Sequence, residues 1–334
     1  MEILVKTPSR LHFGLIDLNG SLGRINGSLG VALNNPGWMM EILSNTNREQ
    51  KKNALELYEN TKQAIREFGN FYQKDIQIPP LRIKKSIPAH IGLGSHTQFL
   101  LALGKILAKF NKISTDSREI AQAMNRGGTS GIGVASFENG GIILDGGHSF
   151  GKGKDKETFA PSSISTAPPP PVIFRHLPPK NWHFVLITPT DEKGASGKKE
   201  QALFQECCPV PEDDVEKICR LILMKILPAI VEDNIKTFGE GLTEMQNEIN
   251  RFGMEKYESG LHKEIMTFLF RLKTVYGSGI SSFGPTIYAL TNSEKHAKKI
   301  LTEIKNNFSV KKFQLLDYSN INRTGAEITI KKEK

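Results

Sequence analysis

A glycine-rich turn at Pro88–Gln98, which reads PAHIGLGSHTQ, is the stretch of this sequence whose residue types most directly indicate a chemistry. Glycines let the backbone pass close to an anion. The N–H groups that open the following apolar helix point toward that anion, and the helix dipole favours its negative charge. A second glycine-rich stretch, Arg126–Val134 (RGGTSGIGV), follows shortly after. Together they predict a site for a phosphorylated or pyrophosphorylated small molecule.

The residues expected to contact phosphate are the glycines, hydroxyls and nitrogen-bearing side chains of these two stretches. They are Gly92, Gly94, Ser95, His96, Thr97 and Gln98 in the first stretch, and Arg126, Thr129, Ser130 and Gly131 in the second. Hydroxyls and backbone N–H groups supply the hydrogen-bond donors that an anion needs. The alternative is that the glycines only make tight turns into helices, because a bare glycine turn is a weak signal.

Arg10, His12 and Arg24 are candidate catalytic residues near the N-terminus. Arg10 and His12 lie on an expected strand, and arginine can hold a carboxylate or phosphate with two hydrogen bonds. Arg24 lies between two Gly-Ser-Leu-Gly turns and is a possible ligand clamp. A surface arginine, a strand histidine without catalytic function and a solvated loop arginine are the open alternatives.

Asp145, His148 and Asp17 are the other candidates for metal or proton chemistry. Asp145 and His148 bracket Gly146-Gly147 as a possible metal or acid–base pair, and a plain turn after a strand is the alternative. Asp17 is a candidate magnesium ligand, because hard cations prefer carboxylate oxygen, although an aspartate that stabilises a turn fits equally well. The loop at Lys193–Lys199 is either a lid over the anion or simply a charged surface loop.

Helices and strands that alternate through both halves must position these residues, so the sequence predicts a mixed α and β fold. Strands are expected at Ile3–Lys6, Leu11–Leu15, Trp38–Leu43, Leu81–Lys85, Gly141–Asp145, His183–Thr188, Thr286–Leu290, Phe313–Leu316 and Ala326–Ile330, and helices at Ala54–Phe68, Thr97–Phe110, Ser117–Asn125, Glu212–Ile226, Asn234–Ile249, His262–Val275 and Ser293–Asn306. Leu18–Gly30 and Gly277–Gly284 are expected to be turns. A Pro-rich linker at 161–171 is expected to separate domains at 1–160 and 172–334.

The composition of the 334 residues, with 24% charged and 38% hydrophobic side chains, is that of an ordinary soluble globular protein. The net charge of +9 fits a basic surface or an anionic small substrate. Basic residues are not interleaved with aromatic ones in a stripe, so no nucleic-acid partner is expected. Three cysteines, two of them adjacent, favour a reducing, cytoplasmic compartment. Neither a signal peptide nor a membrane-spanning run is expected.

Three segments, PSRLHFGLIDL, PAHIGLGSHTQ and SSFGPTIYAL, resemble in this order the motifs of the GHMP superfamily, named for galactokinase, homoserine kinase, mevalonate kinase and phosphomevalonate kinase. The resemblance covers nearly the whole chain. It implies a two-domain α+β fold, with a left-handed βαβ unit in the N-terminal domain and a ferredoxin-like C-terminal domain. It also implies that phosphate groups sit at Gly92–Gln98.

Two positions depart from the kinases of this superfamily. Those kinases typically read GLGSS, in which the second serine helps to hold magnesium, whereas this chain has His96. Many also read SGxD, whose aspartate acts as a base or orients the acceptor, whereas this chain has Gly133. Phosphoryl transfer depends on positioning and charge stabilisation, so these changes argue against an ordinary small-molecule kinase without proving inactivity.

Longer segments, SRLHFGLIDLNGSLGRINGSLG and RGGTSGIGVASFENGGIILDGGH, resemble the β-ribofuranosylaminobenzene 5′-phosphate synthase family of archaeal methanopterin biosynthesis. The resemblance implies a decarboxylating phosphoribosyltransferase that joins phosphoribosyl pyrophosphate to 4-aminobenzoate or 4-hydroxybenzoate and releases carbon dioxide and pyrophosphate. It implies Mg²⁺ and no ATP, and a homodimer is the default oligomer. His90 would then either face the aromatic substrate or serve packing. The alternatives are an ATP-dependent GHMP kinase and a non-catalytic metabolite-binding protein.

Overall fold

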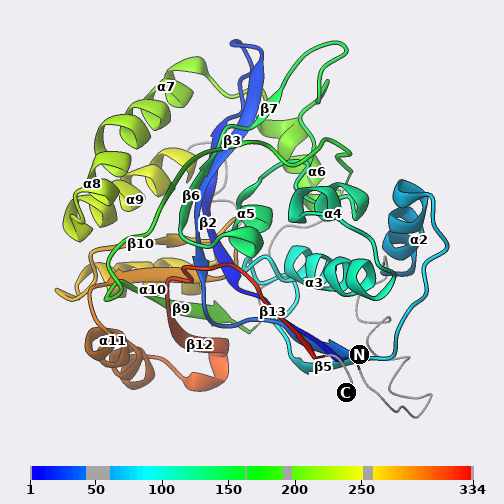
Figure 1. Cartoon of the computed structure of the whole chain (residues 1–334). Helices are drawn as coiled ribbons and strands as arrows, with labels where there is room; N and C mark the ends of the chain where they lie inside the picture. The colour runs from blue at the N-terminus through cyan, green and yellow to red at the C-terminus, as the bar shows by residue number, and fades with distance from the viewer. Residues whose placement is uncertain (1, 43–60, 162–163, 191–197, 251–258, 332–334) are drawn as a thin grey trace.

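The computed structural model describes residues 2–42, 61–161, 164–190, 198–250 and 259–331. It contains three antiparallel sheets with helices packed around them (Figure 1). In the described residues the helices are α2 (Thr61–Tyr72), α3 (Ser95–Phe110), α4 (Ser117–Ala123), α5 (Ile132–Glu138), α6 (Lys198–Cys207), α7 (Glu212–Leu221), α8 (Leu227–Val231), α9 (Ile235–Asn250), α10 (Gly260–Phe270) and α11 (Glu294–Asn307). A π-helical turn, Ile222–Ile226, joins α7 to α8, and a 3₁₀ turn, Val310–Lys312, follows α11. The mixed α and β class is therefore confirmed.

The first sheet joins strands from both ends of the chain. Its order is β13 (Glu327–Lys331), β1 (Glu2–Lys6), β4 (Met39–Ile42) and β5 (Leu81–Lys85). Because β13 pairs with β1, Ile330 lies opposite Ile3, and the two strands run side by side in Figure 1.

The second sheet holds the strands that carry most of the N-terminal site candidates. Its order is β2 (Ser9–Asp17), β3 (Arg24–Leu33), β6 (Ile142–Asp145) and β8 (Val172–His176), and β7 (His148–Ser149) also pairs with β3. Both β8 and β13 come after the Pro-rich segment 161–171, and both pair with strands of the first half of the chain. The boundary between the two domains stays a prediction, and any division must allow for these two strands.

The third sheet forms the C-terminal half, in the order β10 (Gly277–Ile280), β11 (Ile287–Thr291), β9 (His183–Pro189) and β12 (Phe313–Asn320). Aromatic rings join this sheet to the second one. The ring of Phe13 on β2 lies 5.2 Å from that of Tyr288 on β11 and 6.0 Å from that of Phe184 on β9, centroid to centroid. All three side chains are buried, so β2 is held against the C-terminal half along its core-facing side.

Several expected elements are confirmed closely. The expected helix Thr97–Phe110 is α3, which is buried along most of its length. Asp116 and Glu119 form a capping box at the start of α4, with Asp116 Oδ1 accepting from Glu119 N at 2.8 Å. The side chain of Ser293 caps α11. The expected start of the Ala54–Phe68 helix lies outside the described residues, and α2 continues it from Thr61 to Tyr72.

Two glycine-rich segments that were expected to be turns are turns only in part. Much of Leu18–Gly30 lies in the ten-residue strand β3, and Gly277–Gly284 begins with strand β10. At Gly30, an added Cβ would lie 2.5 Å from both Ile132 Cγ2 and the carbonyl oxygen of Leu11. This glycine therefore allows α5 and a neighbouring strand to approach closely, a use of glycine that looks like turn composition in the sequence.

Two other boundaries differ from expectation. The second glycine-rich stretch contains a helix, α5, that begins at Ile132, and the helix expected at His262–Val275 ends at Phe270. No helix among the described residues has the length and apolar character needed to cross a membrane.

Candidate functional site

The first glycine-rich stretch opens α3 as expected, and the side chain of Arg10 lies over it. Gly94 is the N-cap residue, with φ 75° in the left-handed region that favours glycine, and no side chain caps this helix. The first N–H groups of an α-helix have no partner within the helix, so this end suits an anion. An added Cβ at Gly94 would lie 3.0 Å from Arg10 Cγ. Arg10 also donates a hydrogen bond to the carbonyl oxygen of Gly92.

Gly92 faces protein backbone where an anion was expected. Its carbonyl oxygen accepts a hydrogen bond of 2.7 Å from Ser281 Oγ. An added Cβ at Gly92 would lie 2.5 Å from the carbonyl oxygen of Ser281 and 3.0 Å from that of Gly284. The C-terminal turn that follows β10 therefore explains why residue 92 has no side chain.

The second glycine-rich stretch lies against the first, as the prediction requires. Arg126 donates to Thr97 Oγ1 from Nε at 3.2 Å and from Nη2 at 3.0 Å. Gln98 is fully buried and donates from Nε2 to the carbonyl oxygen of Gly133 at 2.7 Å. An added Cβ at Gly133 would lie 3.0 Å from Thr97 Cγ2. Arg10, Thr97 and Arg126 therefore meet at the start of α3, while Gln98 binds α5.

The hydroxyls of the second stretch bind protein atoms. Thr129 is buried and donates to the carbonyl oxygen of Ala160 at 3.0 Å. Ser130 Oγ lies 2.6 Å from Ser28 Oγ on β3. These hydrogen bonds hold the loop against the rest of the protein. The role of Thr129 and Ser130 in binding phosphate stays a prediction.

Asp145 is a buried anchor for the second stretch. Its carboxylate accepts hydrogen bonds from the N–H groups of Gly131 at 2.9 Å and Gly147 at 3.0 Å, and from the hydroxyl of Ser28. Burial raises the pKa of Asp145 to about 6, against the lowering effect of these hydrogen bonds. Asp145 thereby holds the N-terminus of α5.

The expected partner of Asp145, His148, has its own contact with the backbone. Its Nε2 lies 2.9 Å from the carbonyl oxygen of Pro168, and the side chain is buried. Burial lowers the pKa of His148. The two side chains are therefore each engaged by other parts of the protein.

Arg24 and Asp17 make their hydrogen bonds with other parts of the chain than α3, whereas the charge of His90 acts on His96 in the first turn of α3. Arg24 is exposed and donates to the carbonyl oxygens of Gly146 and, at 3.1 Å, Gly147. Asp17 Oδ1 accepts from the N–H groups of Asn19 at 2.8 Å and Gly20 at 3.0 Å, which is the turn-stabilising arrangement that the sequence left open. His90 is exposed, with φ 60°.

Two charged residues that sequence reasoning missed, Lys156 and Glu200, complete the site. Lys156 is 5% exposed and donates to the carbonyl oxygens of Gly128 and Ala160, both at 2.9 Å. Burial lowers its pKa to about 8, although the negative charge of Glu200 acts in the opposite direction. A single lysine in a charged segment carries no sequence pattern that marks it as buried.

Glu200 lies near the start of α6, and its carboxylate is close enough to Arg126, Arg10 and Lys156 to interact with their charges. Burial raises the pKa of Glu200 to about 7, while these three cations lower it. The expected lid, Lys193–Lys199, falls mostly outside the described residues, which resume at Lys198 in α6.

We name Arg10, Arg126, Lys156 and the first turn of α3 (Ser95–Thr97) the cationic cradle. Burial and the positive charge of Arg126 lower the pKa of Arg10 to about 10. Burial, together with the charge of Arg126, lowers the pKa of His96 to about 3, so this side chain is neutral at physiological pH. The cradle concentrates positive charge at the end of a helix whose dipole has the same sign, which is an arrangement for binding a multiply charged anion.

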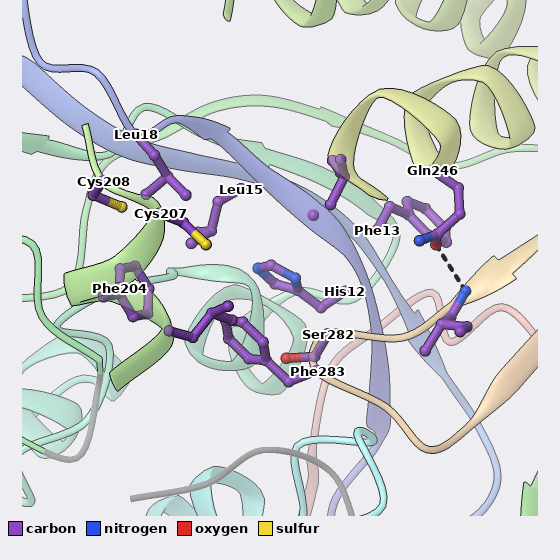
Figure 2. A pocket seen from close by; sticks show the side chains of 14 residues that line it. His12, Phe13, Leu15, Leu18, Phe204, Cys207, Cys208, Gln246, Ser282 and Phe283 are labelled. Carbon is purple, nitrogen blue, oxygen red and sulfur yellow. Dashed lines mark hydrogen bonds between the residues drawn. The ribbon is translucent and has the colours of Figure 1, made fainter. Parts of the chain in front are cut away.

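A mainly apolar pocket is lined by His12, which lies two residues from Arg10 on strand β2. Its wall is built from β2, α6, α9, β10 and the turn after β10, and the residues that line it are His12, Phe13, Gly14, Leu15, Leu18, Leu203, Phe204, Cys207, Cys208, Gln246, Ile249, Ile280, Ser282 and Phe283. Figure 2 shows the imidazole of His12 in the pocket, with Leu15 and Phe283 nearby. The rings of Phe204 and Phe283 are 6.0 Å apart in an edge-to-face arrangement. The apolar and aromatic lining suits a small aromatic molecule.

His12 is a neutral polar group in this pocket. Burial lowers its pKa to about 3, and the charge of Arg10 acts in the same direction. Its Nδ1 is buried and has no hydrogen-bond partner in the described part of the protein. Gln246 is instead occupied, since its Oε1 accepts from Ile280 N at 2.8 Å, as the dashed line in Figure 2 marks. His12 is therefore a neutral side chain that lines the pocket and contains one buried nitrogen without a protein partner.

The carboxylates of the described residues do not form a ready-made magnesium site. Among the described residues, no three His, Cys, Asp or Glu side chains cluster as metal ligands. Asp17 Oδ1 and both oxygens of Asp145 already accept hydrogen bonds from the protein. Asp17, Asp145 and the other described side chains therefore do not fit a metal ion that is bound by protein ligands alone.

Comparisons with known proteins agree with this geometry. The N-terminal domain model of the GHMP kinases matches residues 55–141, and the C-terminal model of the GHMP kinases matches residues 226–310. The mevalonate kinase of Methanococcus jannaschii has a similar structure, with a TM-score of 0.63 over 96% of this chain and 98% of that one at 16% identity. These findings confirm the expected two-domain, GHMP-kinase-like α+β fold.

Two curated proteins are similar over most of their sequences. The β-ribofuranosylphenol 5′-phosphate synthase of Methanocaldococcus jannaschii is 42% identical over 91% of this chain and 92% of its own length. The protein of the same name from Methanothermobacter thermautotrophicus is 38% identical over 88% of this chain and 90% of its own.

Proposed function

The chain belongs to the β-ribofuranosylphenol 5′-phosphate synthase family within the GHMP superfamily, and we propose that it condenses phosphoribosyl pyrophosphate with 4-hydroxybenzoate. The products are β-ribofuranosylphenol 5′-phosphate, carbon dioxide and pyrophosphate, on the route to tetrahydromethanopterin. The relatives' name supports the hydroxy acid over 4-aminobenzoate, because a phenol product keeps the ring hydroxyl of its precursor. Magnesium, a homodimer, an archaeal source and a cytoplasmic location remain expectations.

The reaction makes two demands on a site. The bond between the anomeric carbon and pyrophosphate breaks, and pyrophosphate leaves with the electron pair. The ring carbon that bears the carboxylate forms the new C–C bond, and the electron pair of the C–CO₂ bond returns to the ring as carbon dioxide departs. Donors and cations must stabilise the leaving anion, and an apolar surface must hold the ring against it.

The observation that carries the proposal is the adjacency of the two subsites on strand β2. Arg10 belongs to the cationic cradle, and His12, two residues along the same strand, lines the apolar pocket. Side chains two positions apart on a strand lie on the same face. A substrate whose pyrophosphate lies in the cradle can therefore turn its anomeric carbon toward a ring in the pocket.

The cradle residues would stabilise pyrophosphate as it leaves. Arg10 and Arg126 are guanidinium groups, which can bind phosphate oxygens with paired hydrogen bonds. The first turn of α3 adds N–H groups and the positive end of its dipole. We keep Mg²⁺ as a proposed cofactor that would enter bound to the phosphate oxygens of the substrate, as this ion commonly does.

The same reaction explains why a glycine at position 133 is acceptable. No substrate hydroxyl has to be deprotonated, so the aspartate that many superfamily kinases carry there has no task. The Cα of Gly133 lies beside Thr97 at the start of α3, where a carboxylate would repel an anion in the cradle. In the pocket, the neutral imidazole of His12 can hydrogen-bond a polar group of the aromatic acid without adding charge.

Mass analysis of reaction products tests the proposal. Purified protein is incubated with phosphoribosyl pyrophosphate, magnesium and either 4-hydroxybenzoate or 4-aminobenzoate, without ATP. We expect a ribofuranosylphenol 5′-phosphate from the hydroxy acid. A phosphorylated product that forms only with ATP would favour the kinase alternative, and tight binding without any product would favour a metabolite-binding protein.

A further inference from the structure

We propose that the carboxylate of Glu200 contacts the ribose of the substrate, between the cationic cradle and the apolar pocket, and stabilises the positive charge that develops at its anomeric carbon. The inference rests on the proposed function and adds a catalytic residue to it. Neither the glycine-rich stretches nor the N-terminal motif contains this residue.

The first step is the position of Glu200 on α6. Leu203 and Phe204, three and four residues further along the helix, line the apolar pocket together with Cys207. Residues at these spacings share one helix face, so Glu200 lies on the pocket-facing side, one turn nearer the start of α6. Figure 2 shows Phe204 and Cys207 reaching from this helix toward the pocket.

The second step is the position of the carboxylate relative to the cradle. Glu200 interacts electrostatically with Arg126, Arg10 and Lys156, and it is partly buried. A single short helix therefore presents an acid to the cationic cradle at one turn and apolar groups to the pocket at the next. The side chain lies at the junction of the two subsites.

The third step is the place of the ribose. Its anomeric carbon carries the pyrophosphate at the start of the reaction and the ring carbon at the end, so it must lie within bonding reach of both. If pyrophosphate is in the cradle and the ring is in the pocket, the ribose occupies the junction where Glu200 lies.

The fourth step is the charge. A carboxylate beside the cradle repels pyrophosphate, so anion binding alone does not explain an acid at this position. The ribose becomes positively charged when the bond to pyrophosphate breaks ahead of the new C–C bond. In its ionised form, the carboxylate of Glu200 at this partly buried site stabilises that state more than the uncharged ribose of the ground state, which is the condition for accelerating the reaction. Glu200 supplies charge only, and no proton changes place.

The test compares Glu200→Gln with the wild type and with Glu206→Gln, a change of the same type at an exposed position of the same helix. We expect Glu200→Gln to lower kcat about 100-fold, a usual effect of removing one group that stabilises transition-state charge. Binding of phosphoribosyl pyrophosphate, measured by calorimetry without the aromatic acid, should be unchanged or tighter because a repulsive charge is lost. Glu206→Gln should match the wild type in both measurements.

A second variant, Glu200→Asp, keeps the inference testable if Glu200→Gln does not fold. Glu200→Asp keeps the charge but withdraws it by one methylene, and we expect it to lose less kcat than Glu200→Gln. If Glu200→Gln does not fold, a kcat of Glu200→Asp equal to that of the wild type overturns the inference.

Three results would overturn the inference. If the wild type is active and Glu200→Gln has the same kcat, Glu200 has no part in the mechanism, while the proposed function still holds. Weaker binding of phosphoribosyl pyrophosphate with unchanged kcat would show that Glu200 only positions the cations. Wild-type protein that makes no product from phosphoribosyl pyrophosphate and 4-hydroxybenzoate overturns the proposed function, and the inference with it.

Discussion

Arg126 donates hydrogen bonds of 3.2 Å from Nε and 3.0 Å from Nη2 to the hydroxyl oxygen of Thr97. This contact joins the two glycine-rich stretches, because Thr97 lies in the first turn of α3 and Arg126 opens the second stretch. It fixes a guanidinium group beside a helix N-terminus, so that side-chain charge and helix dipole act on the same ligand.

Replacing the shared acceptor tests this contact. Thr97→Val keeps the side-chain shape but removes the oxygen that holds Arg126, and a hydrogen bond to a charged group contributes about 1.5–3 kcal/mol. We expect the Kd for phosphoribosyl pyrophosphate, measured by calorimetry, to rise about tenfold. Thr97→Ser keeps the oxygen and should bind like the wild type. Equal affinities for the Val and Ser variants would show that this contact does not organise the cradle.

The position of Gly133 can be probed with two side chains of the same shape. Both Gly133→Asn and Gly133→Asp place a Cβ about 3.0 Å from Thr97 Cγ2, so both must displace Thr97 slightly. Only Asp adds a negative charge next to the proposed pyrophosphate site. We expect the Asp variant to bind phosphoribosyl pyrophosphate at least tenfold more weakly than the Asn variant, which corresponds to about 1.4 kcal/mol.

Calorimetry at two salt concentrations separates charge from shape at this position. The difference between the Asp and Asn variants should shrink at high salt, as expected for an electrostatic effect. If both variants bind equally well, residue 133 does not lie beside the anion.

Burial of neutral His12 predicts a pH dependence of stability. Its pKa is about 3 in the folded protein against an ordinary value of 6.5, so between these values the unfolded chain binds more protons than the folded one. The free energy of unfolding should therefore fall as the pH falls through this window. His12→Phe removes this contribution and should make the slope between pH 4 and 6 shallower by up to about 1.4 kcal/mol per pH unit.

Denaturant unfolding of the wild type and His12→Phe at several pH values measures these slopes. The variant should keep part of the pH dependence, because the pKa of His96 is also lowered to about 3 by burial. Identical slopes for the two proteins would contradict the burial of a neutral imidazole at position 12.

The apolar pocket predicts that the two substrates respond differently to one change. Phe204→Ala removes a ring that lines the pocket and lies 6.0 Å from Phe283. An aromatic contact is commonly worth about 0.5–1.5 kcal/mol beyond the area that it buries. We expect the KM for 4-hydroxybenzoate to rise about tenfold while the Kd for phosphoribosyl pyrophosphate stays within about twofold.

The matched control is Phe270→Ala, because this ring is 75% exposed at the end of α10. It should leave both constants unchanged. A larger effect of Phe204→Ala on phosphoribosyl pyrophosphate than on the aromatic acid would reverse the assignment of the two subsites.

The sequence predicted the parts of the site that depend on local backbone chemistry. A glycine-rich turn followed by an apolar helical period predicts the helix Thr97–Phe110, and the structure has this helix as α3, which begins two residues earlier at Ser95. Glycine in a strand is different, because the need for Gly30 arises from α5, a helix more than a hundred residues away. The local composition around Gly30 predicts a turn, because it contains no information about a helix that is distant in the sequence.

Local sequence also failed to predict the roles of three charged residues, Lys156, Glu200 and Asp145. Lys156 and Glu200 become part of the site only when folding brings Glu200 close to the charges of Arg10, Arg126 and Lys156. Asp145 was predicted as a candidate because it and His148 bracket Gly146-Gly147, but its carboxylate is engaged with backbone N–H groups. Burial and hydrogen-bond partners are properties of the folded chain, so residue type and spacing could not reveal them.

The central claim is that the site couples loss of pyrophosphate to loss of carbon dioxide on two different substrates. The most direct measurement follows both products in one reaction, with 4-hydroxybenzoate labelled in its carboxyl carbon, phosphoribosyl pyrophosphate and no ATP. The account predicts labelled carbon dioxide and pyrophosphate in equal amounts, each matching the ribofuranosylphenol 5′-phosphate formed. Pyrophosphate released without carbon dioxide, or no turnover until ATP is added, would contradict it.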